Sequence, residues 1–291
     1  MHLAVLCSTD SWYLKDLRRA AADRHEITQL TFRSLSADVP PKSSGVSSAG
    51  TDLQSFDAVL VRTMPPGSLE QVVFRMDALA RLEAAGGTVI NPAKAIEAAV
   101  DKYLATAKLH AAGLHVPRTM TCQTVDDAMA AFNSLGGDVV LKPLFGAEGR
   151  GIARLNDEAL AQRAFSLVAS LGGVIYLQEF IPHEGFDIRV LLIGKQAWGM
   201  RRRNPLDWRT NVSRGATAES FELTDELVEI AHRAADAIGA PLAGIDLLPG
   251  RDGQLYAIEV NAVPGWQALS RSLNVDVAAC VLEYLQAARH V

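Results

Sequence analysis

Three oxygen-bearing side chains in the segment from Asp246 to Asn261 are spaced so that they can hold a divalent cation. Two apolar runs joined by Gly-Arg-Asp-Gly predict a β-hairpin in this segment. Because side chains alternate along a strand, Glu259 and Asn261 share one face and Val260 points to the other. If the hairpin folds back as written, Asp246 approaches the same face. Oxygen ligands suit Mg²⁺ or Mn²⁺ better than zinc, although three polar residues on a solvated sheet face would give the same pattern.

A second segment with the residues for chemistry is a strand that ends in Lys142 and runs into a turn containing Gly146, Gly149 and Gly151. Glycines let backbone N–H groups approach phosphate oxygens, and Lys142 supplies a positive charge beside them. The spacing is neither that of a P-loop nor that of a dinucleotide-binding fingerprint. A hairpin turn with a solvated lysine remains the other interpretation.

Two further segments carry polar groups at useful positions. Residues 178–181, Gln-Glu-Phe-Ile, form the end of an apolar strand that can present backbone groups to the edge of a purine, or simply the edge of the core. Three arginines at 201–203 precede a polar loop with Arg209, Asn211 and Arg214. Guanidinium groups bind carboxylate or phosphoryl oxygens well, although basic clusters are more often solvated surface.

Composition limits the classes of protein that are compatible with the chain. The 291 residues include 49% hydrophobic and 21% charged residues, as in an ordinary globular protein, and the net charge of −5 gives no footprint for nucleic acid. Cys7, Cys122 and Cys280 are far apart and predict neither disulfides nor zinc. No signal peptide and no membrane span is apparent, so we expect a cytoplasmic protein that binds neither nucleic acid nor membrane.

The elements that must position these residues follow two patterns. Strands and helices alternate up to residue 92, which predicts a small parallel α/β domain with strands at Leu3–Cys7, Glu26–Phe32, Phe56–Arg62 and Thr88–Asn91. A capping box of Ser68 and Gln71 opens one helix, and the Ser-, Gly- and Pro-rich segment 34–51 predicts a mobile surface loop. Beyond residue 92 we predict helices at 93–112, 125–135, 222–239 and 276–288, and strands at 139–142, 174–180, 187–193 and 197–203.

The ordered set of these motifs resembles the ATP-grasp superfamily and, within it, the RimK-like α-L-glutamate ligases. The resemblance covers essentially the whole chain and rests on Lys102, Lys142-Pro-Leu-Phe-Gly-Ala-Glu-Gly-Arg-Gly, Gln178-Glu-Phe-Ile, Asp187-Ile-Arg, Arg202-Arg203, Arg209-Thr-Asn-Val-Ser-Arg-Gly, Asp246 and Glu259-Val-Asn. It implies an α/β protein with a small parallel α/β N-terminal domain, residues 1–92, followed by two α+β subdomains, residues 93–182 and 183–291, that grip ATP. Arg62-Thr-Met-Pro-Pro-Gly resembles a subgroup linked to tetrahydromethanopterin-type cofactor pathways.

The resemblance also implies a role for each motif. It assigns ATP binding to Lys102, Lys142, the adenine hinge at Gln178, Glu179, Phe180 and Ile181, the ribose-side acid Asp187, the flap glycines Gly146, Gly149 and Gly151, and Asn211. It assigns two Mg²⁺ or Mn²⁺ ions to Asp246, Glu259 and Asn261. It assigns catalysis to Arg189, Arg203, Arg209 and Arg214, facing the transferred phosphoryl group and the acid substrate.

The implied reaction joins a carboxylate to an amine with ATP, through an acyl phosphate. We expect L-glutamate to be added to a carboxylate-bearing small molecule of the pterin type. Glutamylation of a protein C-terminus, another ATP-grasp peptide ligase and a kinase that phosphorylates a hydroxyl stay open. A shorter loop between Arg203 and Arg209, and Arg201 in place of an acid, leave the acceptor undetermined. The number of residues added, the linkage, the base that deprotonates the amine and a homo-oligomeric state are also left open by the sequence.

Overall fold

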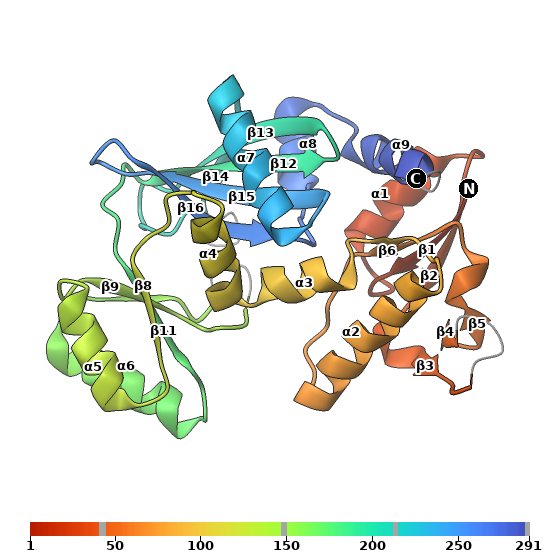
Figure 1. Ribbon diagram of the computed structural model, residues 1–291. Coiled ribbons are helices and arrows are strands. Elements are labelled where there is room, and N and C mark those ends of the chain that lie inside the picture. Colours follow the sequence, from red (N-terminus) through yellow and green to blue (C-terminus); the bar gives the residue numbers. More distant parts are fainter. Residues whose placement is uncertain (41–44, 147–149, 212–214, 289–291) are drawn as a thin grey trace.

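The computed structural model describes residues 1–40, 45–146, 150–211 and 215–288, and its N-terminal part is a parallel α/β unit (Figure 1). The strand order is β2-β1-β6-β7 and every pair is parallel, as predicted. The strands are β1 (His2–Leu6), β2 (Glu26–Leu30), β6 (Ala58–Val61) and β7 (Val89–Ile90), with helices α1 (Trp12–Ala21) and α2 (Leu69–Ala84). The capping box is confirmed, because Ser68 and Gln71 each accept a hydrogen bond from the other's backbone N–H, at 3.3 and 3.2 Å.

Residues 34–51 are predicted to be a mobile surface loop, but most of the described residues of this segment form regular secondary structure, so the prediction is wrong there. A small antiparallel sheet forms there from β3 (Leu35–Ala37), β4 (Val46–Ser48) and β5 (Thr51–Asp52), between the short 3₁₀ helices η1 (Phe32–Ser34) and η2 (Leu53–Ser55). Val46 is buried in the core, and the buried Ser48 hydroxyl donates to the Thr31 carbonyl at 3.0 Å. Burial and hydrogen bonding by these few residues outweigh the turn-forming composition.

The central part of the chain forms an antiparallel sheet in the order β10-β9-β11-β8. Two helices pack together on one face of this sheet (Figure 1). Phe132 meets Phe165 edge-on between them, with 6.4 Å between ring centroids. The elements are β8 (Thr119–Cys122), α5 (Val125–Ser134), β9 (Val139–Lys142), β10 (Ala153–Leu155), α6 (Glu158–Ser170) and β11 (Ile175–Glu179). Strand β10 and helix α6 were not predicted.

The C-terminal sheet is antiparallel throughout, in the order β14-β13-β12-β15-β16. Its strands are β12 (Phe186–Ile193), β13 (Gln196–Arg203), β14 (Thr217–Phe221), β15 (Leu242–Pro249) and β16 (Leu255–Asn261). Helix α7 (Asp225–Ile238) packs on one face. Helices α8 (Gln267–Leu273) and α9 (Val277–Ala288) lead the chain back to α1, so the C-terminal helix lies beside the N-terminal sheet (Figure 1).

The helical segment expected over 93–112 is divided into α3 (Ala93–Val100) and α4 (Lys102–Ala111). Asp101 separates the two helices because it takes an extended conformation and caps α4 by accepting from Leu104 N at 3.0 Å. This break places Lys102 at the first position of a helix. Apolar residues of α3 and α4 belong to the same core as the C-terminal sheet, which continues into the N-terminal unit.

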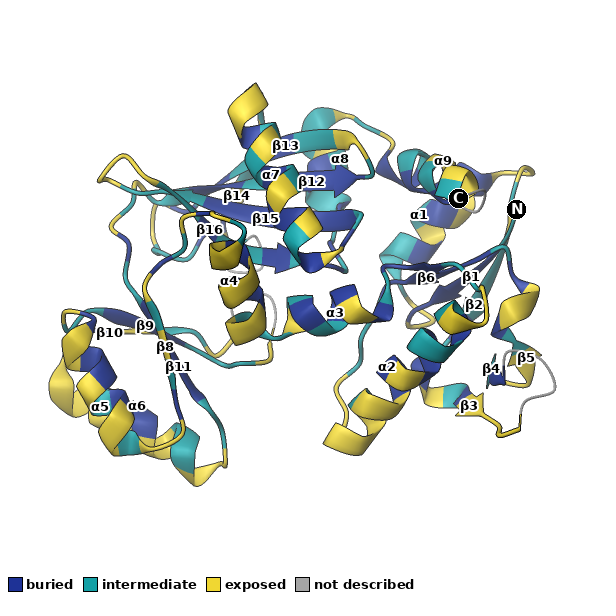
Figure 2. Ribbon diagram, viewed as in Figure 1, coloured by how far each residue is buried: buried dark blue, intermediate teal, exposed yellow. Residues whose placement is uncertain are grey.

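Burial follows the layers, with dark strands between helices whose outer faces are exposed (Figure 2). Cys7 and Cys122 are buried, as expected for small apolar side chains. Among the helices of the described residues, none combines the length and apolar character that crossing a membrane requires.

Candidate active site

Charged side chains collect on one face of the C-terminal sheet. Asp246 on β15 lies directly opposite Arg189 on β12 and directly opposite Glu259 on β16. Asp187, two residues before Arg189, lies opposite Arg202 on β13. Residues opposite each other in an antiparallel pair point to the same side, so all five share one face. The predicted approach of Asp246 to Glu259 is therefore confirmed.

Asp246 is the centre of a buried ionic network. Its carboxylate accepts from Arg189 at 2.6 and 2.7 Å, and Arg202 lies 2.8 Å from it. Arg202 also forms a bidentate pair with Asp187, which accepts from the Thr210 hydroxyl as well. Two guanidinium groups and two carboxylates thus neutralise each other away from water, the arrangement that buried charges require.

The network keeps Asp246 and Arg202 ionised, whereas at Asp187 burial outweighs Arg202 and raises the pKa of that carboxyl above its usual value. Burial opposes ionisation of Asp246, but Arg189 and Arg202 outweigh burial and lower the pKa of Asp246 below its usual value. Burial likewise opposes the charge on Arg202, but Asp246 and Asp187 outweigh it and raise the pKa of Arg202. Asp246 is therefore a carboxylate at neutral pH.

Glu259 differs from Asp246 because it forms no hydrogen bond or ion pair with any other residue that the structure describes. It lines a pocket between the central and C-terminal sheets. Most predicted site residues line the same pocket, namely Lys102, Lys142, Gly146, Gln178, Glu179, Phe180, Ile181, Asp187, Arg209, Asn211 and Asp246. The pocket therefore gathers cations, carboxylates and an apolar hinge from segments far apart in the sequence.

Two lysines bring positive charge into this pocket. Lys102 Nζ donates to the Gly146 carbonyl at 2.7 Å, and Lys142 Nζ donates to Gln178 Oε1. Burial lowers the pKa of Lys142 to about 8, an effect that Glu259 partly offsets and Lys102 increases. Burial also lowers the pKa of Lys102, and again Glu259 partly offsets it. Two partly desolvated ammonium groups would bind a polyanion strongly.

The hinge after β11 combines occupied and free backbone groups. Phe180 N donates to the Asp138 carbonyl at 3.0 Å, and the Glu179 carboxylate accepts from Arg118 N at 2.8 Å. The N–H of Ile181 has no hydrogen-bond partner in the described part of the chain. Buried backbone donors are rarely left unpaired, so this group is suited to a ligand.

The loop between β13 and β14 closes one side of the pocket. Asn204 fixes it by donating to the Arg209 carbonyl at 3.0 Å and accepting from Leu206 N at 3.1 Å. Trp208 meets Phe180 edge-on with 5.8 Å between ring centroids. The Arg209 guanidinium is held by Asp207, with a shortest contact of 2.6 Å.

Four predicted residues in the described part of the chain do not line the pocket, and one of them, Arg189, is paired with Asp246 instead of facing the pocket. Arg203 alternates with Arg202 along β13 and therefore projects to the opposite face, where it lies 5.0 Å from the Phe186 ring. Asn261 Oδ1 accepts from Val263 N at 2.8 Å. Gly151 has φ +71°, and a Cβ there would lie 2.9 Å from the Pro143 ring. Gly149 and Arg214 lie outside the described residues.

Sequence reasoning missed Arg202 and Thr210 as members of the site. The sequence does show that Asp187 and Arg189 share one face of β12, and that Arg202 lies on the opposite face of β13 from Arg201 and Arg203. Register between those strands decides which arginine faces the carboxylates, and register cannot be counted from spacing alone.

Two antiparallel sheets enclose a pocket with paired lysines on one side and paired carboxylates on the other, and this arrangement is the ATP-grasp fold. The chain belongs to the RimK-like ATP-grasp family, whose model matches residues 99–285. It is an ATP-dependent amino-acid ligase.

Individual relatives agree with this membership. The chain is 35% identical over 263 residues to the tetrahydromethanopterin:alpha-L-glutamate ligase of Methanosarcina acetivorans, covering 80% of this chain and 81% of that protein. It is 29% identical over 292 residues to the ribosomal protein bS6–L-glutamate ligase of Escherichia coli, covering 98% and 96% of the two chains. The ATP-grasp ligase PsnB, solved with a minimal precursor, Mg and ADP, has the same fold, with a TM-score of 0.76 and 22% identity over 99% of this chain and 97% of that one.

Proposed function

We propose that this ligase joins L-glutamate to a carboxylate of a small pterin-type acceptor, with ATP converted to ADP and phosphate. The observation that carries the proposal is the 35% identity over 80% of the chain to a ligase named for tetrahydromethanopterin and L-glutamate. The pocket supports it, since the enzyme must hold a polyphosphate beside an acid substrate.

In this proposal the two lysines bind ATP phosphates and the hinge binds adenine. The lowered pKa of Lys142 supports the first assignment, because phosphate binding restores the favourable charge on a desolvated ammonium group. The unpaired N–H of Ile181 supports the second, since a purine ring nitrogen accepts such a bond. Both oxygens of Asp187 are already engaged by Arg202, and Thr210 adds a bond to one of them, so Asp187 is better suited to fixing Arg202 than to holding the ribose.

Magnesium would be held by Asp246, Glu259 and Asn261, and the donor set fits that ion. All three offer oxygen, and Glu259 has no partner among the described residues. Asp246 Oδ2 is engaged by both Arg189 and Arg202, but Oδ1 accepts a single hydrogen bond, from Arg189, and keeps a lone pair for the ion. The Asn261 oxygen accepts one bond from Val263 N and keeps a second lone pair. Bound Mg²⁺ supplies neutralisation of the charge that develops on the transferring phosphoryl group. Two ions are proposed, with Glu259 shared between them.

The chemistry requires activation of the acceptor carboxylate, which is a poor electrophile. Transfer of the γ-phosphoryl group to a carboxylate oxygen gives an acyl phosphate, and the neutral amine of glutamate then displaces phosphate. Arg209 lines the pocket and would exchange its Asp207 partner for phosphoryl oxygens. Arg189 and Arg202 keep Asp246 ionised and in place throughout.

The proposal is tested by incubating the protein with ATP, Mg²⁺, L-glutamate and a pterin acceptor that ends in a free carboxylate. Mass spectrometry should show the acceptor heavier by one or more glutamyl residues, with one ADP released per residue added. An acceptor whose terminal carboxylate is blocked as an amide is the matched control. ADP release of equal rate with the blocked acceptor contradicts the proposal.

Glutamylation of a protein C-terminus is the second candidate, favoured by the near-complete coverage of the bS6-modifying relative. A peptide with a free C-terminal carboxylate, assayed in parallel under the same conditions, separates the two. Glutamyl addition to the peptide but not to the pterin acceptor would decide for the second candidate.

A further inference from the structure

Two buried polar side chains at the carboxyl ends of the N-terminal parallel strands contact the backbone at the ends of the β15–β16 hairpin. Arg62 follows β6 and is 5% exposed, and Asn91 follows β7 and is fully buried. In open α/β sheets this edge usually lies free and binds ligands. Here the C-terminal sheet covers it.

Asn91 bonds to the first residue of β15 and to the residue that follows β16. Its side-chain nitrogen donates to the Leu242 carbonyl at 2.6 Å and to the Ala262 carbonyl, and its oxygen accepts from Leu242 N at 3.0 Å. Leu242 begins β15, and Ala262 directly follows Asn261. One fully buried side chain thus fixes the start of one strand against the exit of the other.

Arg62 holds the chain two residues further on. Its Nη2 donates to the Pro264 carbonyl at 2.7 Å, and its guanidinium carbon lies 4.2 Å from the centre of the Trp266 ring and 4.7 Å from that of Tyr13. Nε and Nη1 have no hydrogen-bond partner among the described residues, so the two ring faces supply the remaining contacts of a buried cation.

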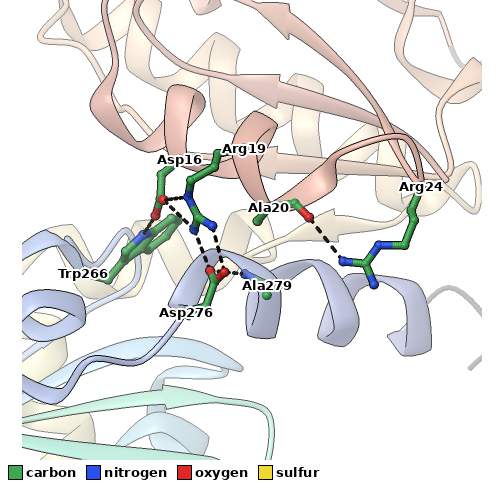
Figure 3. A network of polar contacts seen from close by, with 7 residues as sticks. All are labelled: Asp16, Arg19, Ala20, Arg24, Trp266, Asp276 and Ala279. Carbon is green, nitrogen blue, oxygen red and sulfur yellow. Dashed lines mark hydrogen bonds and ion pairs between the residues drawn. The ribbon is translucent and has the colours of Figure 1, made fainter.

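Trp266, the last residue of the segment 262–266, lies beside α1, and an ion pair links α1 to the start of α9 (Figure 3). The fully buried Trp266 donates from Nε1 to Asp16 at 2.9 Å, and Arg19 joins Asp16 to Asp276 with contacts of 2.8 and 2.7 Å. A Cβ added at Gly265 would lie 2.4 Å from the Tyr13 hydroxyl, so a side chain there would displace the Tyr13 ring. The N-terminal unit therefore determines the path of residues 262–266.

We infer that Arg62 and Asn91 are positioning residues for the divalent-cation site, because they fix the chain that leaves β16 and thereby the places of Glu259 and Asn261. The inference rests on the proposed metal ligands. Neither Arg62 nor Asn91 lines the nucleotide pocket. Their loss should therefore reduce binding that depends on the metal, while nucleotide binding without metal stays unchanged.

The test compares the full-length protein with Arg62→Met and Asn91→Ala by calorimetry of ADP binding, with and without Mg²⁺. The quantity of interest is the gain in ADP affinity that Mg²⁺ provides. Substitutions that disturb the support of metal ligands cost about 10- to 100-fold in metal affinity, so we expect that gain to fall by about tenfold or more in both variants. The affinity for ADP alone should equal that of the unsubstituted protein.

Arg75→Met is the matched control, since Arg75 is also a buried arginine of the N-terminal unit but donates to the Pro65 carbonyl at 2.7 Å rather than to residues 262–266. It should keep the full metal-dependent gain. If Asn91→Ala does not fold, as judged by circular dichroism, Arg62→Met and the milder Arg62→Lys provide the test.

Two results overturn the inference: an unchanged metal-dependent gain in folded Arg62→Met, or an equal loss of ADP affinity with and without Mg²⁺. A lack of metal-dependent gain in the unsubstituted protein is a different result, because it refutes the proposed metal site on which the inference rests.

Discussion

Glu259 and Asp246 lie directly opposite each other on the neighbouring strands β16 and β15, yet their amide substitutions should affect the stability of the protein very differently. Glu259→Gln removes a charge that forms no ion pair with a described residue and supports Lys142 and Lys102 only from a distance, so the free energy of unfolding should change by less than about 1 kcal/mol. Asp246→Asn removes the counter-charge of two buried guanidinium groups at 2.6 to 2.8 Å. Breaking a buried ion pair from one side costs about 3–5 kcal/mol, so this variant should be strongly destabilised.

The effect of Glu259→Gln on turnover should be large although its effect on stability is small. Glu259→Gln should lose turnover by about 10³-fold or more, equivalent to about 4 kcal/mol of transition-state stabilisation, because the proposed shared metal ligand is lost. The assays are ADP release at saturating Mg²⁺ and chemical denaturation of the same preparations. Near-normal turnover of Glu259→Gln would refute the metal assignment, and an unchanged unfolding free energy in Asp246→Asn would refute the buried network.

Three further predictions follow from the site and the core. Because burial lowers the pKa of Lys142 to about 8, this lysine loses its charge as pH rises through that value. The ATP affinity measured by calorimetry should therefore fall by at most about tenfold per pH unit above 8. Lys142→Arg, which stays charged, should flatten this pH profile, and Lys142→Ala should weaken ATP binding at every pH. Arg202→Met should abolish turnover and destabilise the fold, whereas Arg203→Met, on the opposite face, should keep most activity in the same ADP-release assay. Burial raises the pKa of the Cys7 thiol to about 11, so mass spectrometry should find Cys7 unmodified by iodoacetamide at pH 8 unless the protein is unfolded.

Much of the fold could be predicted because local patterns and tertiary packing agree. Strands β6 and β7 of the parallel sheet are continuously apolar, and the β15–β16 hairpin carries both its turn and its alternation in the sequence. The segment 34–51 could not be predicted, because its sheet depends on burial of Val46 and Ser48 against residues elsewhere in the chain. Strand β10 is three residues long and gains its stability from pairing with β9.

In the candidate site, too, some residues could be predicted from local patterns and others depend on tertiary structure. Lys142 and the hinge residues are found from their positions at strand ends, and the structure brings them into one pocket. Arg202 and Arg203 are adjacent and chemically identical, so only the register of β13 against β12 distinguishes them. The partners of Asp246 likewise could not be predicted from the sequence, because Arg189 and Arg202 contact it from two different strands.

Activation of a carboxylate as an acyl phosphate is the central claim, and isotope transfer measures it most directly. An acceptor whose terminal carboxylate carries heavy oxygen is incubated with the enzyme, ATP, Mg²⁺ and L-glutamate, and the released inorganic phosphate is analysed by mass spectrometry. The proposed reaction transfers one heavy oxygen from the carboxylate to each phosphate released. Unlabelled phosphate accompanying formation of the glutamyl product would contradict the account.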